Sequence, residues 1–130
     1  MTFWPRAMMA ATLTGLLAGP AGAQGTVWTA IIPQGFPHNI YVWHLKPDGS
    51  YKEDGRNATN NAAIQPTLTG HWRMTGKHMV LRQDGIDYVF DGNVMGDEYL
   101  GVLYLDGKRF ARFCAVRKTT PPQTCADISA

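Results

Sequence analysis

Closely spaced turn signals divide the chain, from Thr26 onward, into short runs rich in β-branched and aromatic residues. Each signal contains glycine, and together they are Pro47-Asp48-Gly49, Thr75-Gly76-Lys77, Asp84-Gly85, Met95-Gly96-Asp97 and Asp106-Gly107. Asp-Gly favours tight hairpins because glycine accepts the positive φ that such turns require. Strands joined so tightly must pair antiparallel. The four consecutive connections from Thr75 to Gly107 therefore predict a meander of five strands.

The runs between these turns predict about eight strands. They are Thr26–Ile32, Ile40–Lys46, Ser50–Glu53, Leu68–Met74, His78–Arg82, Ile86–Val94, Glu98–Leu105 and Arg109–Arg117. Alternation gives the strands one apolar face, and in Ile86–Val94 the residues Tyr88 and Phe90 lie opposite Asp87. With no helix to cover that face, the sheet must close on itself or split into two. We predict an all-β, up-and-down meander that closes into a small barrel, with a β-sandwich as the alternative.

The first 23 residues have the layout of a secretory signal peptide. Arg6 is the only charge, an uncharged run extends from Ala7 to Leu17, and small residues end at Ala23. The apolar run of about 11 residues is shorter than the roughly 20 that span a membrane. We therefore expect a signal peptide over residues 1–23, no membrane span, and a periplasmic or secreted protein. Residues 24–130 would form a single domain.

Cys114 and Cys125 are the only cysteines in the chain. In an oxidising compartment such a pair predicts a disulfide. This bond would link the C-terminal tail, which carries Pro121-Pro122, covalently to the last strand. A redox-active pair is the alternative, although the C-x-x-C spacing typical of that chemistry is missing.

Charge and motifs favour neither a nucleic-acid partner nor catalysis. Lys and Arg number 12 against 10 Asp and Glu, without a basic stripe. Phosphate-loop and nucleophile-elbow motifs are missing from the sequence, so we predict no enzymatic activity. His71 and His78 flank a tight turn and share the polar face, so they could approach one another. A third ligand is not evident, and we expect neither a metal nor a cofactor.

Aromatic residues supply the candidate binding site. Four of them fall on the apolar face and could line a pocket at one mouth of the barrel, and these are Tyr41, Trp43, Trp72 and Tyr88. The alternative is that they simply fill the interior. Arg112 shares a face with Phe110 and Cys114, and a buried unpaired charge is costly. Arg112 therefore marks a polar site, pairs with an acid, or lies where this face meets solvent.

Three segments carry a resemblance to a known family. They are Leu45-Lys46-Pro47-Asp48-Gly49-Ser50-Tyr51, Gly70-His71-Trp72-Arg73 and Gly76-Lys77-His78-Met79-Val80-Leu81. From Leu45 to Val116 the chain resembles the small lipocalin-like (calycin-type) β-barrels of bacterial envelopes. In lipocalins the Gly-x-Trp motif lies on the first strand, whereas here it comes midway. The resemblance implies a binding protein rather than an enzyme, and similar barrels with one disulfide serve as exported protease inhibitors.

Three functions are compatible with these observations. The first is an exported binding protein for a small apolar or aromatic ligand. The second is a protein-recognition barrel, such as an inhibitor of an exported hydrolase, that uses the loop Asn57–Pro66 or the segment Ile32–Pro37. The third is a structural component of the envelope. An interior cavity of several hundred Å³ would favour the first function and a filled core the second. The oligomeric state stays open.

Overall fold

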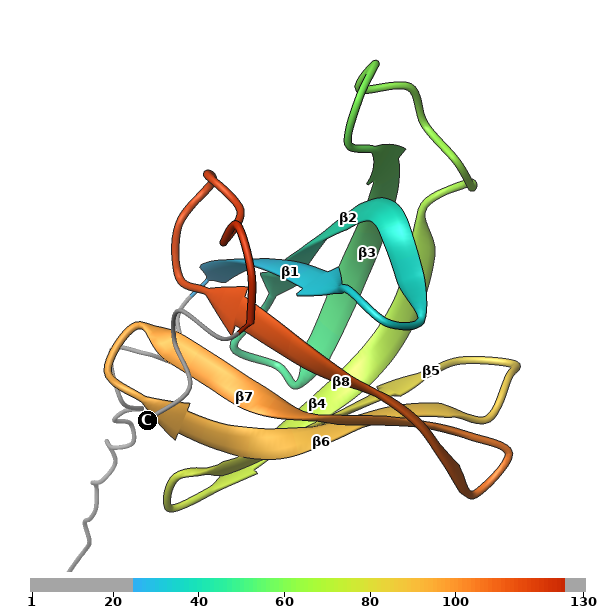
Figure 1. The fold of residues 1–130 in the computed structure, drawn as a ribbon. Coiled ribbons are helices and arrows are strands. Elements are labelled where there is room, and N and C mark those ends of the chain that lie inside the picture. Colours follow the sequence, from blue (N-terminus) through green and yellow to red (C-terminus); the bar gives the residue numbers. More distant parts are fainter. Residues whose placement is uncertain (1–24, 126–130) are drawn as a thin grey trace, which may run out of the picture.

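Eight antiparallel strands form the part of the chain that the computed structural model describes, residues 25–125 (Figure 1). They are β1 (Thr26–Ile32), β2 (Phe36–Leu45), β3 (Ser50–Asn57), β4 (Leu68–Thr75), β5 (His78–Gln83), β6 (Tyr88–Met95), β7 (Glu98–Leu105) and β8 (Lys108–Val116). Each strand pairs with the next, and β1 pairs with β8, so the meander is a closed barrel. The predicted barrel is confirmed, and the sandwich is wrong. The expected signal peptide lies outside the described residues.

Two strands extend four residues further at one end than the sequence indicated. β2 begins at Phe36 rather than Ile40, and β3 continues to Asn57 rather than ending at Glu53. The reason is pairing with neighbouring strands, because β2 and β3 stay in register as far as the pair of Asn39 and Asn57, and Phe36 pairs with Ile32 of β1. By contrast, β6 begins at Tyr88 because Ile86 belongs to the preceding turn, where its carbonyl accepts a hydrogen bond from the Tyr88 N–H.

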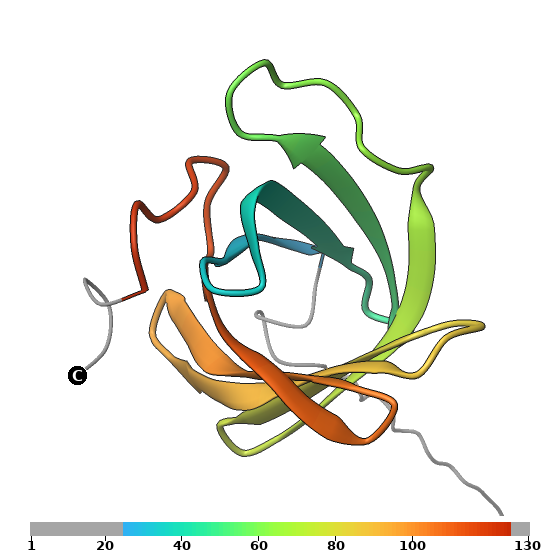
Figure 2. The same cartoon turned by 45° about the vertical axis from the view of Figure 1, so that its right-hand side comes forward.

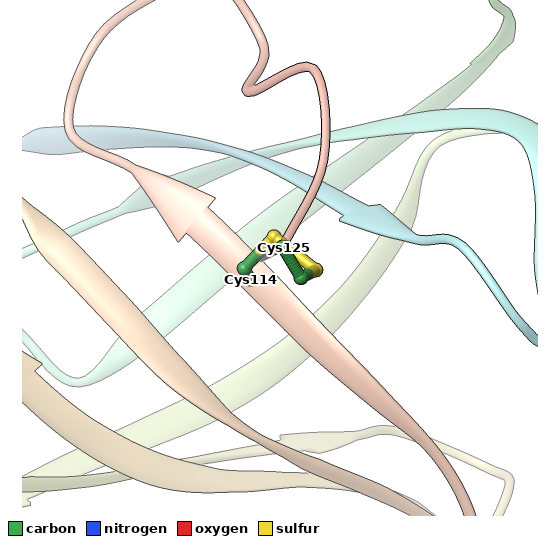
Figure 3. The surroundings of a disulfide bond; sticks show 2 residues. All are labelled: Cys114 and Cys125. Carbon is green, nitrogen blue, oxygen red and sulfur yellow. A yellow bond between two sulfur atoms is a disulfide. The ribbon is translucent and has the colours of Figure 1, made fainter. Parts of the chain in front are cut away.

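The barrel closes at a short seam between its first and last strands. β1 and β8 pair at only three positions, from Thr29–Val116 to Ile31–Cys114. The chain after β8 returns along the outside of this seam, beside β1 (Figures 1 and 2). There the Thr29 hydroxyl donates to the Lys118 carbonyl. The disulfide between Cys114 and Cys125, whose Cα atoms are 5.3 Å apart, holds the returning segment (Figure 3). The predicted disulfide is confirmed.

Large side chains fill one half of the barrel. Trp43 is fully buried at its centre, and its ring packs edge-on against Phe90 at 4.7 Å and Phe113 at 5.9 Å. Tyr99 lies 4.8 Å from Phe113, and its hydroxyl donates to the Met79 carbonyl. Edge-to-face packing is favourable because the positive edge of one ring meets the negative face of another. This aromatic cluster forms the floor of the other half of the interior.

Glycine is required on both strands at one point of the β6–β7 pair. Gly92 and Gly101 lie opposite one another in this pair. A Cβ atom on either residue would lie 2.1 Å from a backbone oxygen of the facing strand. Glycine inside a strand often marks such an approach or a bend. Residues 25–125 contain no helix long and apolar enough to cross a membrane.

Candidate ligand-binding site at the open end of the barrel

The other half of the interior is hollow. A cavity of about 460 Å³ lies at the end where the β1–β2, β3–β4 and β5–β6 connections meet, and Ile32, Ile64 and Ile86 from these regions contribute to its wall. Deeper in, Leu103 and Phe90 separate the cavity from the filled half. The lining is mainly aliphatic and aromatic, as is typical of small-molecule pockets. The barrel is therefore neither filled throughout nor hollow throughout.

Strand alternation places a carboxylate in this apolar wall. On β3, Tyr51, Glu53 and Gly55 face inward, while Lys52 and Asp54 face solvent. The Glu53 side chain consequently lies inside the barrel, and the residue is only 3% exposed. A carboxylate is rarely buried to this extent unless hydrogen-bonding partners surround it.

Three neutral N–H groups surround the Glu53 carboxylate. The indole Nε1 of Trp43 donates to Oε1 at 2.9 Å. The amides of Gln65 and Gln83 both donate to Oε2, at 2.9 Å and 3.1 Å. None of the ion pairs among residues 25–125 includes Glu53. The carboxylate is thus well hydrogen-bonded but has no positive partner within the described part of the protein.

The β3–β4 connection brings one of these partners to the mouth. Its backbone folds back on the barrel through hydrogen bonds from Ile64 N to Gly55 O and from Ala58 N to His38 O. The side chain of Asn57 accepts two further backbone N–H bonds within the loop. Gly55 leaves the room that Gln65 occupies, since a Cβ there would lie 2.9 Å from the Gln65 amide carbon. The long polar β3–β4 loop therefore forms part of the cavity wall through Ile64 and Gln65.

Aromatic side chains form much of the upper wall. Tyr41 and Tyr88 line the cavity with Phe36, whose ring lies 6.4 Å from that of Tyr41. The amide of Asn39 donates to the Tyr41 hydroxyl oxygen at 2.9 Å. Burial raises the pKa of the Tyr41 phenol, which favours its neutral, hydrogen-bond-donating form. Two residues of the predicted aromatic site, Tyr41 and Tyr88, are therefore together in the cavity wall.

The other three predicted site residues lie elsewhere. Trp43 is beneath the cavity floor, where its indole N–H donates a hydrogen bond to Glu53. Trp72 faces inward at the opposite end of the barrel, where its Nε1 donates to the Lys46 carbonyl. Arg112 is exposed on the outer surface beside Pro33. The structure thus divides the predicted set among the cavity, its floor, the far end and the outside.

Sequence reasoning missed the polar part of the site. Glu53, Gln65 and Gln83 were not among its candidates, although Glu53 follows Tyr51 at the two-residue spacing that places both on one face. That spacing was the available signal. Gln65 and Gln83 are 12 and 30 residues from Glu53 in the chain, and nothing local to them indicates their convergence.

His71 and His78, which could have approached one another across the β4–β5 turn, do not come together. In the β4–β5 pairing His71 lies opposite Arg82, whereas His78 lies opposite Thr75 at the far end of the ladder. Each histidine instead contacts its own acid, with His71 at 3.0 Å from Asp84 and His78 beside Asp91. Within residues 25–125, no three His, Cys, Asp or Glu side chains are placed to hold a metal ion together.

Comparison of the whole chain with protein-family models, curated proteins and solved structures finds no match. The cavity and the chemistry of its wall are therefore the basis on which a function is assigned.

Proposed function

We propose that this protein is an exported binding protein that takes a small apolar or aromatic ligand in the open end of its barrel. The observation that carries the proposal is the cavity of about 460 Å³ with its largely apolar wall. Its volume is within the range of about 300–1,000 Å³ that small-molecule sites occupy. The filled half below gives the site a rigid floor, and the lipocalin-like resemblance of Leu45–Val116 is consistent with ligand binding.

The disulfide supports the exported location. Disulfides persist in oxidising compartments and are rare in the cytosol. The Cys114–Cys125 bond therefore indicates an extracytoplasmic protein. A periplasmic or secreted location, reached through a signal peptide over residues 1–23, is part of the proposal.

A narrowed cavity tests the proposal directly. Leu68 lines the cavity, while the adjacent Thr69 is exposed on the outer surface. We expect the uncharged fluorescent probe N-phenyl-1-naphthylamine to bind the purified protein saturably, with one site per chain. Leu68→Trp should weaken this binding by occupying part of the cavity, and Thr69→Trp should retain it. An unchanged affinity in Leu68→Trp, or no binding by the unmodified protein, would contradict the proposal.

A second candidate is protein recognition by the rim of the same cavity. Three large apolar side chains are exposed there, with Ile64 39%, Ile86 47% and Phe110 43% accessible. Phe110 is the extra residue at a register shift between β7 and β8, and its ring lies 5.3 Å from that of Phe36. Such side chains are frequent at interfaces. Under this alternative, Ile64→Asp would abolish capture of an exported hydrolase while Leu68→Trp would not. A structural role in the envelope stays a prediction.

A further inference from the structure

Resting on the proposed function, we infer that the ligand carries an organic cation, such as an alkylammonium group, that pairs with Glu53 inside the cavity. The side chain of Glu53 is the only Asp, Glu, Lys, Arg or His among the described residues that line the cavity. The apolar part of the ligand would contact the aliphatic and aromatic residues of the cavity wall. Its positive end would contact the Glu53 carboxylate.

The hydrogen bonding of Glu53 leaves room for one more donor. An ionised carboxylate has about four lone-pair positions. Trp43 occupies one on Oε1, and the amides of Gln65 and Gln83 occupy two on Oε2. The less occupied atom is Oε1, and Glu53 belongs to the cavity wall. One lone-pair position of the carboxylate therefore has no donor among the described residues, and we assign it to the ammonium N–H.

Charge favours a cation over a neutral or anionic group. The three existing donors are uncharged, and no ion pair in residues 25–125 involves Glu53. A buried charge without an opposite partner is costly, so a ligand that supplies the partner gains affinity. A carboxylate or phosphate in the same place would be repelled by Glu53 and would meet no basic side chain in the described lining.

The aromatic wall adds to this preference. Phe36, Tyr41, Tyr88 and Phe90 all line the cavity. Aromatic faces attract cations within about 6 Å, and cages of such rings are a known means of binding substituted ammonium groups. The raised pKa of Tyr41 favours an uncharged phenol, whose ring can contact an apolar chain and whose oxygen can accept a hydrogen bond. The cavity thus combines one anion with several π faces.

Three probes with eight carbon atoms each separate these contributions. Isothermal titration calorimetry would compare octylammonium, octanol and octanoate on the purified protein. Because a charge-assisted hydrogen bond is stronger than a neutral one, we expect octylammonium to bind at least about tenfold more tightly than octanol. Octanoate should bind most weakly. This comparison uses the unmodified protein and so does not depend on whether any variant folds.

Two matched substitutions on β3 locate the effect. Glu53→Gln keeps the shape of the side chain, and the amides of Gln65 and Gln83 can turn to meet it. In this variant the ratio of octylammonium to octanol affinity should fall to about one. Asp54→Asn removes a neighbouring carboxylate that faces solvent, and it should retain the preference.

The possible failures are distinguishable. Equal binding of octylammonium and octanol by the unmodified protein overturns the cation inference and leaves the proposed function standing. Binding of none of the three probes refutes both. A preference lost equally in Glu53→Gln and Asp54→Asn, or retained in Glu53→Gln, overturns the assignment to Glu53.

Discussion

Replacing Trp43 with phenylalanine should destabilise the protein through one identifiable hydrogen bond. The buried indole N–H donates to Glu53 Oε1 at 2.9 Å, and a hydrogen bond to a charged group contributes about 1.5–3 kcal/mol. The smaller ring also leaves a gap against Phe90 and Phe113, which costs roughly 1 kcal/mol. We expect the free energy of unfolding to fall by about 2.5–4 kcal/mol.

A double-mutant cycle isolates the hydrogen bond from the packing. Glu53→Met removes the carboxylate at similar length and leaves the Trp43 N–H unpaired, at a cost of about 1–3 kcal/mol. The amides of Gln65 and Gln83 border the cavity and can turn into it. The double variant lacks both partners of this hydrogen bond, so it has no indole N–H without an acceptor and no carboxylate that has lost a donor. It should therefore be more stable than the sum of the single effects by about 1–3 kcal/mol.

Guanidinium chloride unfolding, followed by far-ultraviolet circular dichroism, measures this coupling. With a slope of roughly 3 kcal/mol per molar, a coupling of about 2 kcal/mol corresponds to about 0.7 M in the midpoint. Trp72→Phe is the matched control, since its indole donates to the Lys46 carbonyl instead. Trp72→Phe and Glu53→Met should be additive. Additivity within about 0.5 kcal/mol for the Trp43 cycle as well would refute the role assigned to this bond.

Three further predictions concern the barrel as a whole. The double variant Cys114→Ala/Cys125→Ala opens a loop of sequence separation 11. Its free energy of unfolding should fall by about 2.8 kcal/mol and its calorimetric Tm by about 13 °C. A decrease in Tm of less than about 5 °C would contradict the stabilising role assigned to this disulfide at the β1–β8 seam. Burial raises the pKa of Tyr51 and Tyr99, so the stability that they contribute is complete below the ordinary value of 10.0 and is lost as the pH rises above it. Their phenolate absorbance should appear together with the loss of near-ultraviolet circular dichroism, and its appearance in a still native protein would count against their burial. Gly92→Ala places a Cβ 2.1 Å from a backbone oxygen of β7 and should cost more than about 2 kcal/mol in chemical unfolding, whereas an unchanged midpoint would mean that the two strands separate easily.

Local chemistry in the sequence was sufficient to predict the strands and their order. The bounds of β1 and β7 agree with the prediction, because turn residues and side-chain alternation act over two to four residues. The longer β2 and β3 were underestimated, since their ends depend on pairing with neighbouring strands rather than on their own composition. The pairing of Cys114 with Cys125 could be predicted from the count of cysteines and the expected oxidising compartment.

What the sequence by itself determined is the meander, the direction of pairing and the inward face of residues such as Tyr41, Trp43 and Trp72. Only the closed barrel decided the level at which each inward side chain lies, because level depends on the register between strands. Tyr41 therefore lines the cavity, Trp43 lies beneath its floor, and Trp72 is at the opposite end. Closure also brought Gln65 and Gln83 to Glu53 from distant parts of the chain, and so created a buried carboxylate that no local pattern could reveal.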